Sequence, residues 1–174
     1  MRHFSTSFAA AVTLSALALP AFAADQPSDP QIAHIAYTAG DIDVKAGQLA
    51  LEKSQNKAVR AFASDMVRDH KAVNDKALAL VKKLNVTPED NSTSKALSDQ
   101  AAQKHDKLSK LSGAAFDKAY VENEVAFHKT VDGALETTLI PSSSNSELKG
   151  LLQTGLKIFQ GHLAHAEHLA STLK

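Results

Sequence analysis

The sequence contains no cysteine and no tryptophan, and its aromatic residues are only seven Phe and two Tyr. The absence of cysteine excludes disulfide bonds, thiolate zinc sites, cysteine nucleophiles and lipid attachment through an N-terminal cysteine. The 19 Lys and Arg balance the 19 Asp and Glu, so neither a nucleic acid nor an anionic membrane is an expected partner. Alanine and leucine are abundant, which favours packed helices over a sheet.

No apolar run is long enough to span a membrane, because a spanning helix needs about 20 residues. The longest run, residues 8–19, follows a short basic start and precedes Pro20 and Ala21-Phe22-Ala23. This pattern is typical of a secretory signal peptide. We therefore predict that residues 1–23 are cleaved, and that residues 24–174 form a single domain in the periplasm or otherwise outside the cytoplasm. An N-terminal membrane anchor is the alternative.

Helical periodicity predicts four long helices and one shorter crossover helix, and nothing in the sequence alternates like a strand. Asp29 should cap the first helix, with Pro30 at its first position. The second helix spans about residues 57–85, and the third spans residues 113–139 and stops before Pro141. A capping box of Ser144 and Glu147 should start the fourth. A thinner amphipathic helix over about residues 94–111 connects the second to the third.

Each long helix has one apolar stripe, so the predicted fold class is an all-α four-helix bundle with an additional short crossover helix. Several glycines lie inside the predicted helices, at an expected cost of about 1 kcal/mol each. We expect close approach between helices to compensate for this cost at Gly40, Gly47, Gly155 and Gly161.

Several polar residues lie within these apolar stripes. At 100° per residue, every long helix turns at least one of them inward. The residues are Asp43 on the first helix, His70 on the second, Glu124 and His128 on the third, and His162 on the fourth. The histidines and Asp43 lie near helix midpoints, and midpoints share a level whichever way neighbouring helices run. We therefore predict one central layer of imidazoles and carboxylates.

Burying such groups without partners would cost several kcal/mol each. Three imidazoles with a carboxylate are a common ligand set for zinc, iron, copper or nickel, which predicts a metal site formed by His70, His128, His162, Glu124 and Asp43. A buried hydrogen-bond network, with or without a trapped water, would satisfy the same groups and fix the helix register. The sequence leaves both interpretations open. It identifies no cofactor, and a transition-metal ion is the one candidate.

No known catalytic motif accompanies this layer. The sequence has no nucleophile elbow, phosphate-binding loop, H-E-x-x-H motif or dinucleotide fingerprint, and we assign no catalytic residue. The leading hypothesis is an exported metal-binding or stress-related module. The alternative is a non-catalytic interaction or envelope-protection protein whose polar layer only fixes the fold. A redox or hydrolytic metalloenzyme is a third hypothesis, which requires an open coordination position.

Three segments of the chain are similar to a known family. They are residues 59–63 (Val-Arg-Ala-Phe-Ala) with residues 66–70 (Met-Val-Arg-Asp-His), residues 116–120 (Phe-Asp-Lys-Ala-Tyr) with His128, and His162-Leu163. Together they resemble the exported bacterial proteins grouped as domain of unknown function 4142, over about residues 31–169. These proteins are often labelled outer-membrane proteins and placed among ferritin-like bundles. The resemblance therefore implies an exported, ferritin-like bundle, and it brings no established activity.

Overall fold

A computed structural model describes residues 26–173, and the predicted signal peptide lies outside the described residues. The four long helices are α1 (Asp29–Lys53), α2 (Lys57–Lys83), α4 (Gly113–Ala134) and α6 (Ser146–Thr172), and the crossover helix is α3 (Ser92–Ser109). A π-helical turn, η1 (Leu135–Leu139), and the short α5 (Ile140–Ser142) follow α4. No residue between 26 and 173 lies in a strand. Within the same range, no helix is both long and apolar enough to cross a membrane.

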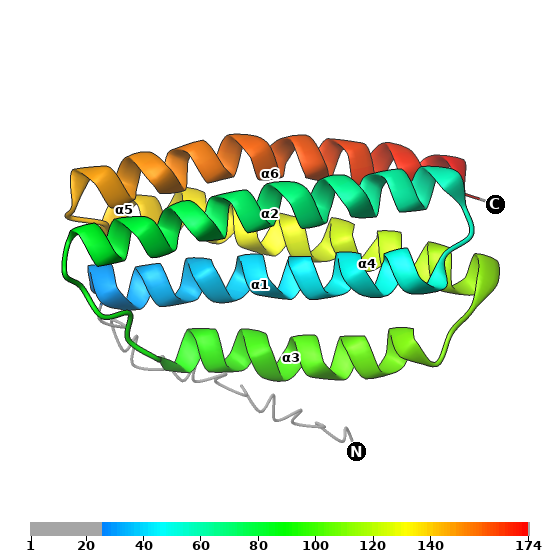
Figure 1. Ribbon diagram of the computed structural model, residues 1–174, viewed down its shortest axis with the longest axis horizontal. Coiled ribbons are helices and arrows are strands. Elements are labelled where there is room, and N and C mark those ends of the chain that lie inside the picture. The colour runs from blue at the N-terminus through cyan, green and yellow to red at the C-terminus, as the bar shows by residue number, and fades with distance from the viewer. Residues whose placement is uncertain (1–25, 174) are drawn as a thin grey trace, which may run out of the picture.

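The long helices lie side by side, and α3 runs along the outside of α1 (Figure 1). α1 and α2 are antiparallel, as are α4 and α6 (Figure 1). Because α3 returns the chain along the length of the bundle, α2 and α4 run in the same direction. A single long crossover of this kind is the connection found in ferritin-like bundles. The predicted fold class, a four-helix bundle with an additional crossover helix, is confirmed.

Two predicted helix starts are wrong by one residue. Ser28 rather than Asp29 caps α1, and it forms a capping box with Gln31. Asp29 instead accepts hydrogen bonds from the backbone N–H groups of Ser144 and Asn145, at 3.0 and 2.9 Å. Asn145 rather than Ser144 caps α6, because the Ser144 hydroxyl donates to the Asp29 carboxylate. The same carboxylate thus joins the start of α1 to the turn before α6.

The third predicted helix continues past Pro141 instead of stopping before it. In η1 the Ile140 N–H reaches the carbonyl of Leu135, five residues earlier, and the chain then continues as α5 through Pro141. In an α-helix, a proline ring clashes with the carbonyl four residues before it. The helix includes the proline directly after the π turn, where the regular four-residue bonding pattern is already interrupted.

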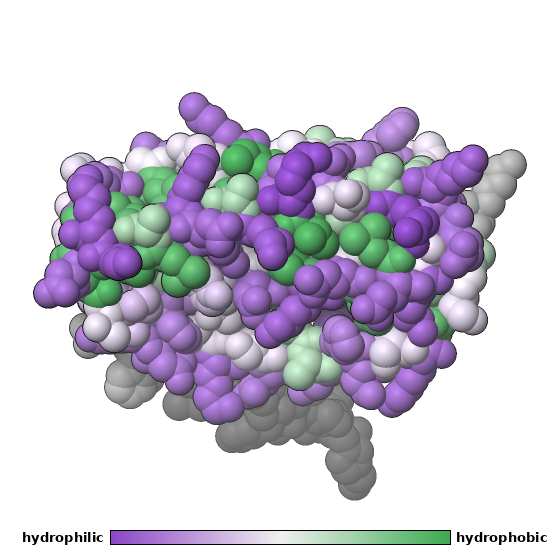
Figure 2. All heavy atoms as spheres, in the orientation of Figure 1, coloured by the Kyte–Doolittle hydropathy of each residue, from purple (hydrophilic) through white to green (hydrophobic). Residues whose placement is uncertain are grey.

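Two apolar clusters fill the bundle on either side of its polar middle layer. One is centred on Phe62, Met66 and Tyr120 near the α1–α2 loop, and the other on Ile32 and Leu135 near the opposite end. The outer face in Figure 2 is mostly hydrophilic. Among the described residues, Leu78 is the only large apolar side chain that is well exposed.

The interior glycines do not all mark close helix contacts. A Cβ at Gly47 would lie 2.8 Å from Val67 Cγ2, and a Cβ at Gly40 would overlap the buried side chain of Asn74. These two glycines let α1 and α2 approach closely, as predicted. Nothing lies within 4 Å of a Cβ built at Gly161, so the expected close approach there is wrong.

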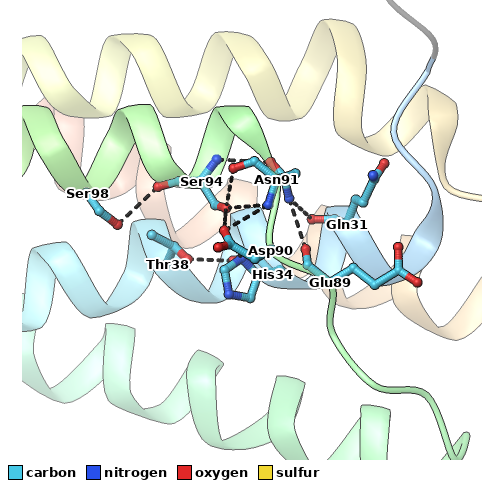
Figure 3. A network of polar contacts seen from close by, with 8 residues as sticks. All are labelled: Gln31, His34, Thr38, Glu89, Asp90, Asn91, Ser94 and Ser98. Carbon is cyan, nitrogen blue, oxygen red and sulfur yellow. Dashed lines mark hydrogen bonds and ion pairs between the residues drawn. The ribbon is translucent and has the colours of Figure 1, made fainter.

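The loop between α2 and α3 is fastened to the first turn of α1 (Figure 3). The Asn91 side chain accepts the Ser94 N–H at 3.0 Å and so caps α3. Its amide nitrogen donates to the carbonyls of Gln31 and Glu89, at 3.4 and 3.1 Å. These bonds hold the N-terminal end of α3 against the bundle.

Candidate metal centre

The five residues predicted from the sequence meet in one buried layer between the apolar clusters. Their exposed fractions are 2% for Asp43, 1% for His70, 0% for Glu124, 1% for His128 and 7% for His162. α1, α2, α4 and α6 each contribute at least one of them. The structure therefore brings together the whole predicted set, while ligation of a metal by that set stays a prediction.

Three imidazoles form the nitrogen-rich part of this layer. One ring nitrogen from each of His70, His128 and His162 lies within 4.8 Å of one from each of the other two. Their ring centroids are 5.2, 5.6 and 5.8 Å apart. The Phe159 ring stacks on His70 with a centroid distance of 4.4 Å and an interplanar angle of 5°, and so covers one side of the cluster.

Two of the imidazoles are oriented by hydrogen bonds through one ring nitrogen. His128 Nδ1 lies 3.1 Å from the carbonyl oxygen of Glu124, and His162 Nε2 lies 3.0 Å from Asp69 Oδ2. A carbonyl or carboxylate can only accept, so these ring nitrogens donate. In a neutral imidazole, the nitrogen that does not donate carries a free lone pair. Those nitrogens, His128 Nε2 and His162 Nδ1, are buried and have no hydrogen-bond partner.

His70 differs from the other two in having no hydrogen bond that orients its ring. Its Nδ1 lies 3.5 Å from Asp43 Oδ2, and both of its ring nitrogens are buried with no hydrogen-bond partner. Burial and the neighbouring imidazoles lower the pKa of His70 to about 2, and burial together with His162 lowers the pKa of His128 to about 4. Both rings are therefore neutral near pH 7, which is the form that binds metal ions.

Asp43 and Glu124 form the oxygen-rich part of the layer, next to His128. One carboxylate oxygen from each, together with a ring nitrogen of His128, form a second group whose atoms lie within 4.8 Å of one another. Asp43 Oδ1 and both Glu124 side-chain oxygens are buried without a hydrogen-bond partner. Burial raises the pKa of Glu124 to about 7, and burial together with the charge of Glu124 raises that of Asp43 well above its usual value. The pair therefore tends to retain a proton at neutral pH.

Asp69 contributes to the centre although it is not among the five residues predicted from the sequence. Its carboxylate contacts His162 and also accepts two hydrogen bonds from the neighbouring Arg68, at 2.8 and 2.9 Å. The Arg68 hydrogen bonds, with a smaller contribution from His162, hold the pKa of Asp69 below its usual value. An ionised acceptor thus fixes the ring orientation of His162. Helical periodicity could not identify this role, because a residue at a stripe edge is equally well placed to face water.

Asp132 is a second residue that the sequence analysis missed. It follows His128 by one helical turn, is 5% exposed, and has no hydrogen-bond partner for either carboxylate oxygen. Burial, and to a smaller extent the charge of Glu136, raises the pKa of Asp132 to about 6. Glu124, His128 and Asp132 follow one another at four-residue spacing, and this repeat was the sequence signal that could have identified Asp132 as an inward-facing residue.

The chain matches the family model described as Domain of unknown function (DUF4142) over residues 15–169. The chain is similar in fold to a DUF305 protein from Streptomyces coelicolor, whose crystal structure is described as that of a proposed secreted protein. The TM-score is 0.67 at 10% identity, and the match covers 81% of this chain and 90% of that chain. The crystal structure of a DUF305 fragment from Deinococcus radiodurans has a TM-score of 0.67 at 17% identity, and the match covers 84% of this chain and 99% of that fragment. At such identities the likeness shows the fold alone. No curated protein matches the sequence. The family match, which spans most of the chain, shows that this protein belongs to the DUF4142 family.

Proposed function

We propose that this protein binds a transition-metal ion in the middle of the bundle through His70, His128 and His162. The observation that carries the proposal is a set of buried ring nitrogens without a hydrogen-bond partner: one on His128 and one on His162, whose opposite nitrogens are each held by an acceptor, and both nitrogens of His70. Metal-binding histidines are generally oriented by such an acceptor on the non-ligating nitrogen.

A purely structural network explains these nitrogens less well. Each buried polar atom without a hydrogen bond costs about 1–3 kcal/mol, and the cluster contains at least three such atoms. A hydrogen-bond network should pair them, whereas one ion accepts lone pairs from all three rings. Three imidazoles suit zinc, copper, nickel or iron, and leave a further coordination position for Asp43, Glu124 or water. We assign no catalytic activity to this set.

The same proposal includes export of the protein. The pattern of residues 1–23 supports a cleaved signal peptide and a periplasmic location. The proposed secretion of the Streptomyces coelicolor DUF305 protein, which shares this fold, is consistent with it. A centre built without cysteine also suits an oxidising compartment, because it has no thiolate to lose.

Thermal unfolding of chelator-stripped protein tests the proposal. A ligand that binds only the native state stabilises it by about 2.7 kcal/mol at 100 times its Kd, which raises the Tm of a domain of this size by several degrees. We expect zinc, copper, nickel or ferrous ions to produce this shift, and His128→Ala or His162→Ala to remove it. His168→Ala is the matched control, because His168 lies on α6 and is exposed.

The structural network predicts a different pattern. Without a metal site, none of the four ions would change the Tm of the wild-type protein beyond the change seen in His128→Ala. An unchanged Tm across the four ions, in protein shown by elemental analysis to be metal-free, would therefore refute metal binding and favour the non-catalytic alternative.

A further inference from the structure

A cavity of about 610 Å³ lies between α3 and the bundle, with walls formed by α1, α3 and α4. None of the five residues of the metal centre lines it. α3 is fastened at its two ends, by Asn91 on the Gln31 carbonyl at the start and by Lys53 Nζ on the Ser109 carbonyl at 2.7 Å. On α3 only Ser94 and Leu108 are buried, while Leu97 is partly buried against the apolar cluster around Ile32.

Apolar and polar residues of all three helices line the cavity, and most of its lining surface is apolar. Each wall contributes an alanine: Ala46 from α1, Ala101 from α3 and Ala126 from α4. Larger apolar side chains also line the cavity, namely Ile42, Leu49, Leu97, Leu108 and Phe127, together with polar side chains such as Thr38, Ser98 and Asn123. On α1 the lining runs from Thr38 to Leu49, which at 1.5 Å per residue is about 16 Å. The volume and lining fall within the range of small-molecule sites, and the elongated form suits an alkyl chain.

The charges around the cavity indicate which end group such a chain would carry. Both acidic lining residues have cationic partners: Asp41 pairs with Lys45 at 2.7 Å, and Asp106 pairs with Lys110 at 2.7 Å. Lys104 lines the cavity on α3, and within residues 26–173 it forms no ion pair. A free ammonium group beside an apolar cavity complements a carboxylate.

We propose that this cavity binds a free long-chain alkyl carboxylate, with its chain between α1, α3 and α4 and its carboxylate at Lys104. The proposal is independent of the metal centre, because no residue is shared between the two sites. The ligand enters as a monomer in solution, since the cavity lies between helices of one chain.

Calorimetric titration with octanoate, dodecanoate and dodecanol, below their aggregation concentrations, tests the chemistry of the site. Burying a methylene changes an affinity by about fourfold, so dodecanoate should bind far more tightly than octanoate. Dodecanol should bind more weakly than dodecanoate, because it lacks the charge that Lys104 complements. Absence of dodecanoate binding, or binding only to phospholipid vesicles, would overturn the proposal.

Substitutions test the position of the site. Ala101→Phe should fill the cavity and abolish dodecanoate binding while the helical circular dichroism spectrum stays unchanged; if that variant does not fold, Ala46→Leu serves the same purpose. Lys104→Glu should weaken dodecanoate binding about fivefold or more and leave dodecanol binding unchanged. Lys107→Glu is the matched control on the same helix, outside the cavity. Equal dodecanoate affinities in wild-type protein and in a folded cavity-filling variant would place the ligand elsewhere and refute the proposal.

Discussion

Replacing Asp69 by Asn should weaken metal binding without removing any metal ligand. In the structure the Asp69 carboxylate accepts the hydrogen bond from His162 Nε2, which leaves Nδ1 of the same ring free for the ion. An amide has nearly the same shape but no charge, and it can present its NH₂ group to the ring instead of an oxygen. The ring would then lose the partner that fixes its orientation and raises its basicity.

The expected loss follows from the position of Asp69. Substitution of residues that orient metal-binding histidines typically costs 10- to 100-fold in affinity, about 1.4–2.7 kcal/mol. The Asp69 side chain is 26% exposed and is also held by Arg68, so we expect a value toward the lower end of that range. The folding stability of the metal-free protein should change less, because the carboxylate is partly solvated.

Asp65→Asn is the matched control. Asp65 also accepts a hydrogen bond from Arg68, at 2.6 Å, but Asp69 is the acceptor of His162. Competition with a chromophoric chelator measures the metal affinity of both variants. If Asp69→Asn and Asp65→Asn bind the metal equally tightly, then the Asp69–His162 hydrogen bond does not orient a ligand.

Two further predictions concern the stability of the metal-free protein and are measured by denaturant unfolding. Gly47→Ala should destabilise the bundle by about 1–3 kcal/mol, because its Cβ would meet Val67 and the Ala63 carbonyl. Gly161→Ala, whose Cβ would meet nothing within 4 Å, should stabilise the bundle by up to about 1 kcal/mol. If Gly47→Ala were more stable than Gly161→Ala, α1 and α2 would not be so closely packed. Burial raises the pKa of Asp132 to about 6, so the folded chain keeps this proton to a higher pH than the unfolded chain, and stability is lost as the pH rises through about 6. Asp132→Asn should therefore be more stable than wild type at pH 8, with a difference that shrinks toward pH 4; an equal difference at both pH values would mean that Asp132 is not buried as a carboxylic acid.

The sequence was sufficient to predict the helices and the residues of the central layer, because both depend on helical periodicity. His70 and His128 lie where a 3.6-residue repeat places the interior, and their burial was predicted from that repeat alone. Errors arose where a choice between neighbouring residues decides the structure. Asp29 has the chemistry of a helix cap, but its carboxylate is used by the turn at Asn145, a contact between residues more than a hundred positions apart.

Other features depend on tertiary contacts that periodicity does not encode. Pro141 ordinarily ends a helix, but the chain continues through it directly after the π turn of η1. Asp69 lies at a stripe edge, and its role depends on the rotation of α2 relative to His162 on α6. The cavity beside α3 could not be predicted without the path of the crossover helix, which the sequence did not indicate.

The metal content of untagged protein isolated from its natural host tests metal binding most directly. We expect the wild-type protein to carry one transition-metal ion per chain, because His70, His128 and His162 converge on one cluster. His128→Ala, prepared in the same way, should carry none, and His168→Ala should match the wild type. Equal metal contents in wild-type protein and in folded His128→Ala would contradict the assignment of this buried layer as a metal centre.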